Sequence, residues 1–193
     1  MNGCKIAKEI GVDVVRINAL MRERENFKLE DYINVSVDAI KKTLDKTKDL
    51  NVSLAMENHG VIANRREFVR NLISTVNSDL FGLTFDTGNF YWYGYPINEV
   101  YEILKEFAKY VKHTHMKNAV VPAALKNTMR KPTEVTMAPL YEGDVDMKLV
   151  INTLKNSGYD GDITIEDESM GRFTSEERIE ILKKDVEYLK LLI

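Results

Sequence analysis

Residues 111–119 read VKHTHMKNA and contain two of the three histidines in the chain. The segment alternates like a β-strand, so the side chains of His113 and His115 should point to the same side, with Lys117 beyond them. Imidazole binds metal ions and exchanges protons near neutral pH. This side of the strand is therefore a candidate site for metal or acid–base chemistry.

Three other strand-like segments end in side chains of the same kinds. Their polar residues are Glu57 and His59 in VSLAMENHG, Asp86 and Asn89 in LTFDTGN, and Glu166 and Glu168 in ITIEDES. One acid at the end of an apolar strand is most often a helix cap or a surface residue. Four strands that end in carboxylate or imidazole favour a shared site over that interpretation.

A shared site of this kind needs a cation. Grouping carboxylates in a cavity of low dielectric constant costs roughly several kcal/mol per uncompensated charge, so either their pKa values rise or a cation lies among them. Carboxylate oxygens with one imidazole suit Mn²⁺, Mg²⁺ or Co²⁺ better than a thiolate-rich structural zinc site would, and Cys4 lies far away in sequence. We expect one divalent ion, with Mn²⁺ favoured and Mg²⁺, Co²⁺ or Zn²⁺ as alternatives.

The elements that would position these residues alternate between helical and strand-like patterns. The helical patterns are 2–11, 29–51, 64–77, 97–110, 146–161 and 175–193, and the strands are 12–18, 52–60, 80–90, 111–119 and 162–169. Helices of this length between strands indicate parallel pairing with right-handed crossovers, in a (β/α)8 barrel or an open doubly wound sheet. No GxGxxG motif follows a strand, which favours the α/β TIM barrel.

The barrel is expected to be incomplete. Residues 120–145 are interpreted as a loop with one short strand at 137–141, which brings the number of strands to six, whereas a barrel has eight. The chain begins with a helix, so we expect a single barrel domain over residues 1–193 that lacks its two N-terminal βα units. Its open sheet edges could be covered by a partner, for example in a homo-oligomer.

Composition narrows the class of protein. The chain has 193 residues, 44% of them apolar, and a formal net charge of −3, which suits one core and no nucleic-acid partner. A lone cysteine, Cys4, cannot form an intramolecular disulfide. No apolar run approaches the roughly 20 residues needed to cross a membrane, and the N-terminus lacks the apolar core of a signal peptide. We therefore expect a soluble, cytoplasmic protein that binds no membrane.

The motifs ENHG, FDTGN, HTHMKN, EGDVDM and GYDGDITIE, in this order, resemble the sugar phosphate isomerase/epimerase group of the xylose isomerase-like TIM barrel superfamily. That group includes tagatose and psicose 3-epimerases, hydroxypyruvate isomerases and inosose dehydratases, and the endonuclease IV family shares the barrel. The resemblance runs from about Cys4 to the C-terminus. It implies that one divalent metal ion is bound by Glu57, Asp86, His115 and Glu166. His115 is preferred to His113 because it directly precedes Met-Lys-Asn.

Three further polar residues are candidates for binding a sugar or sugar phosphate. His113 would lie deeper on the strand face, as a hydrogen-bonded core histidine or a substrate contact. His59 could support a ligand, contact substrate or cap a helix. Asn89 stands where the family often has a histidine, which puts the particular substrates of the epimerases and endonucleases in doubt.

Other candidates for substrate binding have equally ordinary alternatives. Arg16 could reach a substrate oxygen or phosphate, or could pair with a barrel carboxylate. The aromatic segment NFYWYGYP, with Trp92, could form a wall against a sugar ring or pack a loop. Lys117 could bind a phosphate or be solvated.

The resemblance implies a metal-dependent isomerase or epimerase that moves a proton through an enediolate of a ketose or related hydroxy-carbonyl compound. Glu57 and Glu166 would be the catalytic base and acid on opposite faces, which inverts a carbon; transfer on one face would isomerise the sugar instead. The alternatives are an endonuclease IV-like phosphodiesterase and a catalytically inactive barrel fragment. The endonuclease reaction uses three metal ions held by many histidines, whereas this chain has three histidines.

Overall fold

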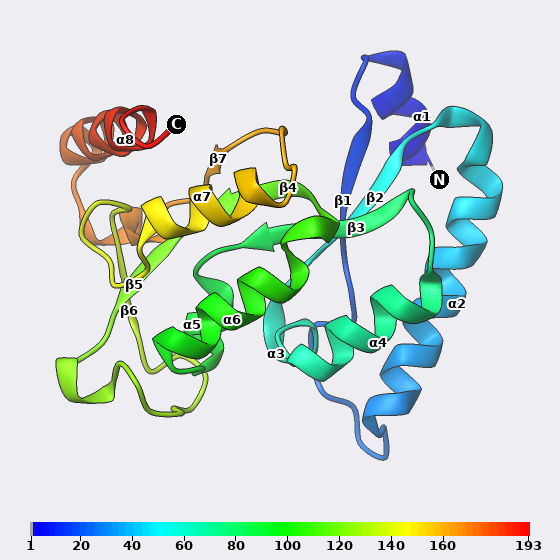
Figure 1. The fold of residues 1–193 in the computed structure, drawn as a ribbon, viewed down its shortest axis with the longest axis horizontal. Coiled ribbons are helices and arrows are strands. Elements are labelled where there is room, and N and C mark those ends of the chain that lie inside the picture. Colours follow the sequence, from blue (N-terminus) through cyan, green and yellow to red (C-terminus); the bar gives the residue numbers. More distant parts are fainter. Residues whose placement is uncertain (1) are drawn as a thin grey trace. The chain divides into compact units, whose positions relative to one another are not determined.

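The main sheet has five strands in the order β1-β2-β3-β4-β7 in a computed structural model that describes residues 2–193 (Figure 1). The strands are β1 Val14–Asn18, β2 Ser53–Glu57, β3 Phe81–Asp86, β4 Val111–Met116 and β7 Thr164–Ile165. The pairs β1·β2, β2·β3 and β4·β7 are parallel. The predicted α/β fold with a parallel, incomplete barrel sheet is therefore confirmed.

Helices separate the strands, as parallel pairing requires. The longer helices are α1 Asn2–Glu9, α2 Leu29–Thr47, α4 Arg66–Val76, α6 Ile97–Phe107, α7 Met147–Asn156 and α8 Ser175–Lys190. The shorter elements are α3 Gly60–Ala63, α5 Asn89–Tyr93 and the 3-10 turns η1 Lys48–Leu50, η2 Ala108–Tyr110, η3 Ala123–Leu125 and η4 Glu168–Arg172. Within residues 2–193, every helix is too short or too polar to cross a membrane.

The chain divides into two compact units, each with its own packing. The first contains the chain up to Phe85, together with Tyr110–His113. Its helices α2 and α4 pack against each other, and α4 buries Phe68, Leu72 and Val76 at helical spacing. Strands β2 and β3 are buried on both faces, as interior parallel strands usually are.

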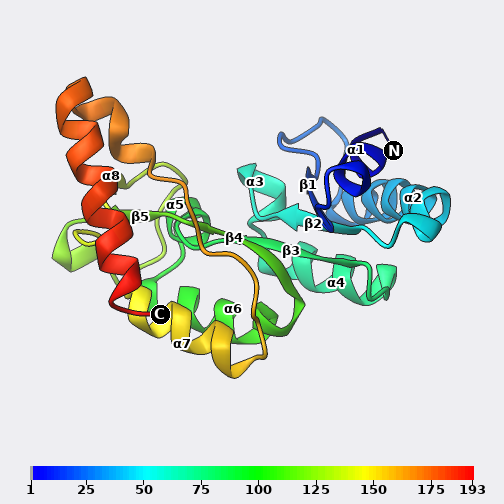
Figure 2. The same cartoon turned by 90° about the horizontal axis from the view of Figure 1, so that it is seen from above.

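The second unit contains Asp86–Lys109 and Thr114–Ile193. Helices α6 and α7 lie side by side in it (Figure 2) and bury apolar faces that include Ile103, Phe107 and Leu154. The prediction of one domain over residues 1–193 stays a prediction.

The expected sixth barrel strand belongs to a different sheet. A strand does form near residues 137–141, as β6 Thr136–Ala138, but it pairs antiparallel with β5 Asn118–Val120 in a separate two-stranded sheet. The prediction of six barrel strands was thus wrong by one strand over residues 2–193. The reason is that β5 follows β4 almost directly and takes the hydrogen bonds of β6. Beyond β6, the Leu140 N–H donates to Asp185 of α8 at 2.8 Å.

Asp185 is a fully buried carboxyl group within α8. Burial raises its pKa from 3.8 to about 7, although the Leu140 N–H acts in the opposite direction, and the nearby Asp167 and Glu142 carboxylates raise it further. Because the folded-state pKa lies above the unfolded-state value, this group lowers stability as pH rises from about 4 to about 7, and the loss is complete above that range.

Replacing Asp185 with asparagine is therefore expected to increase the free energy of unfolding by about 2 kcal/mol near pH 8 and to change it little near pH 4. The amide oxygen can still accept from Leu140, while the buried negative charge is removed. Urea unfolding at both pH values measures the difference. Glu187→Gln, on the exposed face of the same helix, is the control, and an equal gain for Asp185→Asn at both pH values would contradict the expectation.

Candidate metal centre

Three predicted metal ligands meet in the second unit. Asp86 ends β3, His115 is the fifth residue of β4, and Glu166 directly follows β7. The β4·β7 register pairs His115 with Thr164, and the Glu166 N–H donates to the Met116 carbonyl at 3.0 Å. Parallel pairing thereby brings the strand ends together. Asp86, His115 and Glu166 each offer a ligand atom within 4.8 Å of the others.

Asp86 is oriented by the turn that follows it. One carboxylate oxygen, Oδ1, accepts hydrogen bonds at 2.9 Å from the backbone N–H groups of Gly88 and Asn89. The other oxygen, Oδ2, lies 2.9 Å from Lys117 Nζ. Complete burial raises the pKa of Asp86 to about 6, even though the Lys117 charge acts to lower it. Asp86 is thus the carboxylate of this group with the strongest need for a positive charge beside it.

Glu166 has the opposite environment. Its Oε2 atom lies 3.1 Å from His115 Nδ1 and 3.0 Å from Lys117 Nζ. The hydrogen bond from His115, followed by the charge of Lys117, holds the pKa of Glu166 well below its usual range. Glu166 is therefore ionised at neutral pH, next to a carboxyl group whose pKa is raised.

Lys117 lies at the centre of this acidic group. Its side chain is 0% exposed, and Nζ lies within 3.0 Å of Asp86, Glu166 and Glu168. Burial alone would lower the pKa of Lys117, but attraction to Asp86 and Glu168 raises it overall. The interpretation of Lys117 as a solvated strand-end lysine is wrong, because the carboxylates compensate its charge inside the protein.

The FDTGN segment makes room for Lys117. The Thr87 hydroxyl donates to the Lys117 carbonyl at 2.6 Å and accepts from the Lys117 N–H at 2.8 Å. A Cβ atom at Gly88 would lie 2.8 Å from Lys117 Cγ, closer than non-bonded carbons approach. Asn89 Oδ1 is 3.4 Å from Lys117 Nζ, so Asn89 lies at the site, although substrate binding by it stays a prediction.

The fourth predicted ligand, Glu57, is at the end of β2 in the first unit and is fully buried. Arg16 of β1 pairs with its Oε2 atom, which matches the interpretation of Arg16 as the partner of a barrel carboxylate. His59 Nδ1 lies 3.4 Å from Glu57 Oε1. The His59 side chain does not cap α3, although the residue occupies the N-cap position.

His113 is half-buried and also belongs to the first unit. Its predicted contact with substrate stays a prediction, as do those of Arg16 and His59.

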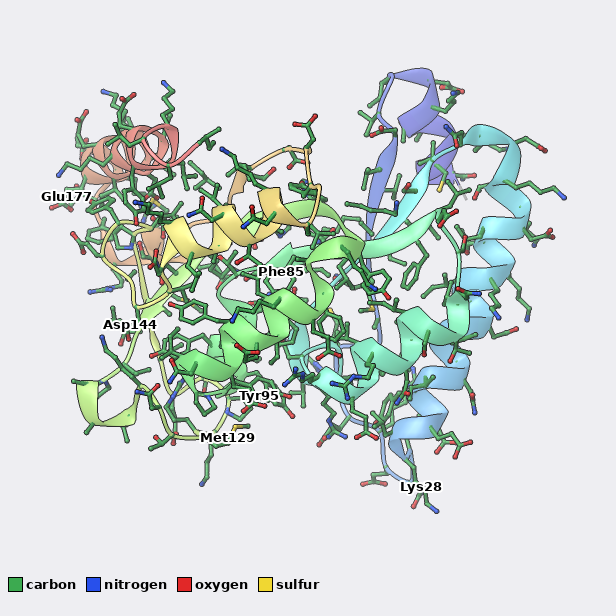
Figure 3. The ribbon with its side chains drawn as sticks, in the orientation of Figure 1. Lys28, Phe85, Tyr95, Met129, Asp144 and Glu177 are labelled. Carbon is green, nitrogen blue, oxygen red and sulfur yellow. The ribbon has the colours of Figure 1, made fainter. Side chains whose placement is uncertain are left out.

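The aromatic segment forms a short helix, α5, instead of a loop. Tyr91 is buried, its hydroxyl donates at 2.9 Å to Asp144, which is labelled in Figure 3, and the Arg130 guanidinium lies 4.4 Å from the centre of its ring. These contacts make Tyr91 a structural residue. Trp92 is half-buried, and its predicted role as a wall against a sugar ring stays a prediction.

The residues predicted to bind metal or substrate did not include Glu168, Thr87 or Gly88, although Glu168 was recognised as a polar residue at a strand end. Glu168 begins η4, and its Oε1 atom is 3.0 Å from Lys117 Nζ. Its alternation with Glu166 was a signal that could have included it. Thr87 and Gly88 could be found only from contacts, because Thr87 bonds the backbone of Lys117 and Gly88 lies against its side chain.

The donor set of the second unit fits a divalent ion. Asp86 and Glu166 offer carboxylate oxygens and His115 offers one imidazole nitrogen, a combination that suits Mn²⁺, Mg²⁺, Co²⁺ or Zn²⁺. A cation would also meet the need for positive charge that the raised pKa of Asp86 indicates.

Two comparisons with known protein sequences address the family of this chain. A family model described as "Xylose isomerase-like TIM barrel" matches residues 1–192. A comparison with curated protein sequences found no match.

Solved structures share the fold at low identity. A xylose isomerase domain protein from Planctomyces limnophilus is 22% identical, with 98% of this chain and 61% of that chain covered and a TM-score of 0.71. The IOLI protein with a bound zinc atom is 22% identical, with coverage of 96% and 65% and a TM-score of 0.73. A D-tagatose 3-epimerase-like protein is 21% identical, with coverage of 98% and 67% and a TM-score of 0.69. The chain thus spans less than two thirds of the first two proteins.

Proposed function

This chain belongs to the xylose isomerase-like TIM barrel family. From that premise we propose that it acts as a divalent-metal-dependent isomerase or epimerase. The substrate would be a sugar or sugar phosphate with a carbonyl next to a hydroxyl-bearing carbon. The reaction would be a proton transfer through an enediolate.

The observation that carries this proposal is the meeting of Asp86, His115 and Glu166 within 4.8 Å at the carboxyl ends of parallel strands. In barrels of this type, catalytic groups gather at those ends. When bound there, a divalent cation would stabilise the negative charge that develops on the substrate oxygens.

Glu166 is the proposed proton acceptor. It is ionised at neutral pH, because His115 and Lys117 lower its pKa, and it is the less buried of the two carboxylates, with its side chain 35% exposed. Asp86, whose side chain is fully buried, would mainly hold the metal. His115 orients Glu166 through the 3.1 Å contact.

Glu57 is proposed as the fourth ligand and as the second acid–base group. The β2·β3 register pairs Glu57 of β2 with Thr84 of β3. Asp86 lies two residues after Thr84 on β3, so the side chains of Thr84 and Asp86 are on the same face of that strand. Arg16 would hold the Glu57 carboxylate in a fixed orientation. If Glu57 and Glu166 act on opposite faces of the substrate, the product is an epimer; if one carboxylate moves the proton on one face, it is an isomer.

The second-unit cluster contains one histidine, so nothing in it favours the phosphodiesterase alternative. The inactive-fragment alternative predicts no metal and no proton exchange. Elemental analysis of the purified chain, together with a panel of ketoses and ketose phosphates in heavy water, distinguishes the proposed function from the inactive-fragment alternative.

We expect about one divalent ion per chain and deuterium at the carbon next to the carbonyl of at least one sugar. Metal content near zero and no deuterium uptake would contradict the proposed function and support the inactive-fragment alternative.

A further inference from the structure

The acidic group around Lys117 carries a defined net charge. Asp86, Glu166 and Glu168 supply three carboxylates, and all three lie within 3.0 Å of the Lys117 ammonium. The ammonium group also donates a hydrogen bond to Asn89 Oδ1 at 3.4 Å. Lys117 is completely buried, so its charge acts on its neighbours with little screening by water.

With the three carboxylates ionised and the ammonium protonated, the net charge of this group is two negative. A histidine that binds metal must be neutral, so His115 adds nothing. Glu57 has its own positive partner in Arg16, so adding Glu57 to the ligand set leaves the balance unchanged. One divalent cation would therefore neutralise the site completely. A trivalent cation would leave an uncompensated positive charge beside the buried side chains of Asp86 and Lys117, which is costly.

We propose that Lys117 is the specificity-determining residue that sets this site to accept a divalent cation and to disfavour a trivalent one, with Glu168 as the carboxylate that it offsets. This inference rests on the metal binding of the proposed function. Asp86 and Glu166 would remain the ligands of the ion, while Glu168 remains beside the Lys117 ammonium.

Removing the charge of Lys117 and removing the charge of Glu168 should shift the preference between divalent and trivalent ions in opposite directions. Lys117→Met leaves three negative charges and favours the trivalent ion, whereas Glu168→Gln leaves one and disfavours it. The double variant Lys117→Met/Glu168→Gln restores two. If Lys117 merely oriented the carboxylates, both single variants would weaken binding of both ions alike.

The experiment is calorimetric titration of the full chain near pH 8 with Mn²⁺ and, separately, Tb³⁺. We expect the ratio of Tb³⁺ affinity to Mn²⁺ affinity to rise at least about tenfold in Lys117→Met, to fall at least about tenfold in Glu168→Gln, and to return to the wild-type value in the double variant. Lys126→Met is the matched control, because Lys126 pairs with Asp144 elsewhere in the same unit; its ratio should equal that of wild type.

A Lys117→Met ratio equal to that of Lys126→Met, or shifts of the same direction in both single variants, would overturn the inference while leaving the proposed function intact. Wild-type protein that binds neither ion would overturn both. Far-UV circular dichroism checks the fold of each variant. If Lys117→Met does not fold, Glu168→Gln alone tests the inference. An unchanged ratio of Tb³⁺ affinity to Mn²⁺ affinity in Glu168→Gln would refute it.

Discussion

Replacing Glu166 with glutamine is expected to lower deuterium uptake from heavy water into the substrate by about 10²- to 10⁴-fold. Glutamine has nearly the same shape and can still accept a hydrogen bond from His115, but its amide cannot accept the substrate proton. The measurement is proton NMR of the active sugar, incubated with enzyme in heavy water.

Two comparisons sharpen this test. Glu180→Gln changes an exposed glutamate of α8 that pairs with Lys183, and it should exchange like wild type. Elemental analysis of Glu166→Gln separates loss of the base from loss of the metal, because Glu166 is also a proposed ligand. Wild-type exchange by Glu166→Gln would remove Glu166 from the reaction.

Mn²⁺ is expected to stabilise the wild-type chain against unfolding, and a chelator should reverse the effect. An ion that binds the folded state alone adds about 2.7 kcal/mol at 100 times its dissociation constant, which corresponds to roughly 5–10 °C in melting temperature for a chain of this size. Asp86→Asn should melt at the same temperature with and without Mn²⁺, because the amide lacks the charge that balances the ion.

The matched control is Asp160→Asn, at an exposed aspartate of the same unit, which should keep the full response to Mn²⁺. Only the shift caused by Mn²⁺ is compared, since Asp86→Asn also removes an ion pair with Lys117 and will lower stability by itself. A wild-type melting temperature that does not respond to chelator would contradict the proposed metal centre.

The parallel strands and the convergence of three site residues could be predicted because both depend on local patterns. Strand alternation identified His115 and Glu166, and the parallel order placed their strand ends at one edge. The β6 strand could not be placed in the same way, because its partner is chosen by the path of the chain after Lys117 and by the Leu140 bond to Asp185.

The burial of the charged residues Lys117 and Asp185 could not be predicted from sequence patterns. Lys117 looks like any lysine at a strand end, and Asp185 looks like one more charged residue in a highly charged helix. Each is buried because of partners that are distant in sequence: Asp86 and Glu168 for Lys117, and the Leu140 N–H for Asp185. Local periodicity carries no information about such partners.

The tight contact between Gly88 and Lys117 links an uncharged position to the electrostatics of the site. With 2.8 Å between a Cβ atom at position 88 and Lys117 Cγ, even a single methyl group would push the ammonium away from its carboxylates. The preference of the cluster for ions of a given charge can thus change during evolution through replacement of Gly88 by another uncharged residue, with every acidic and basic residue retained.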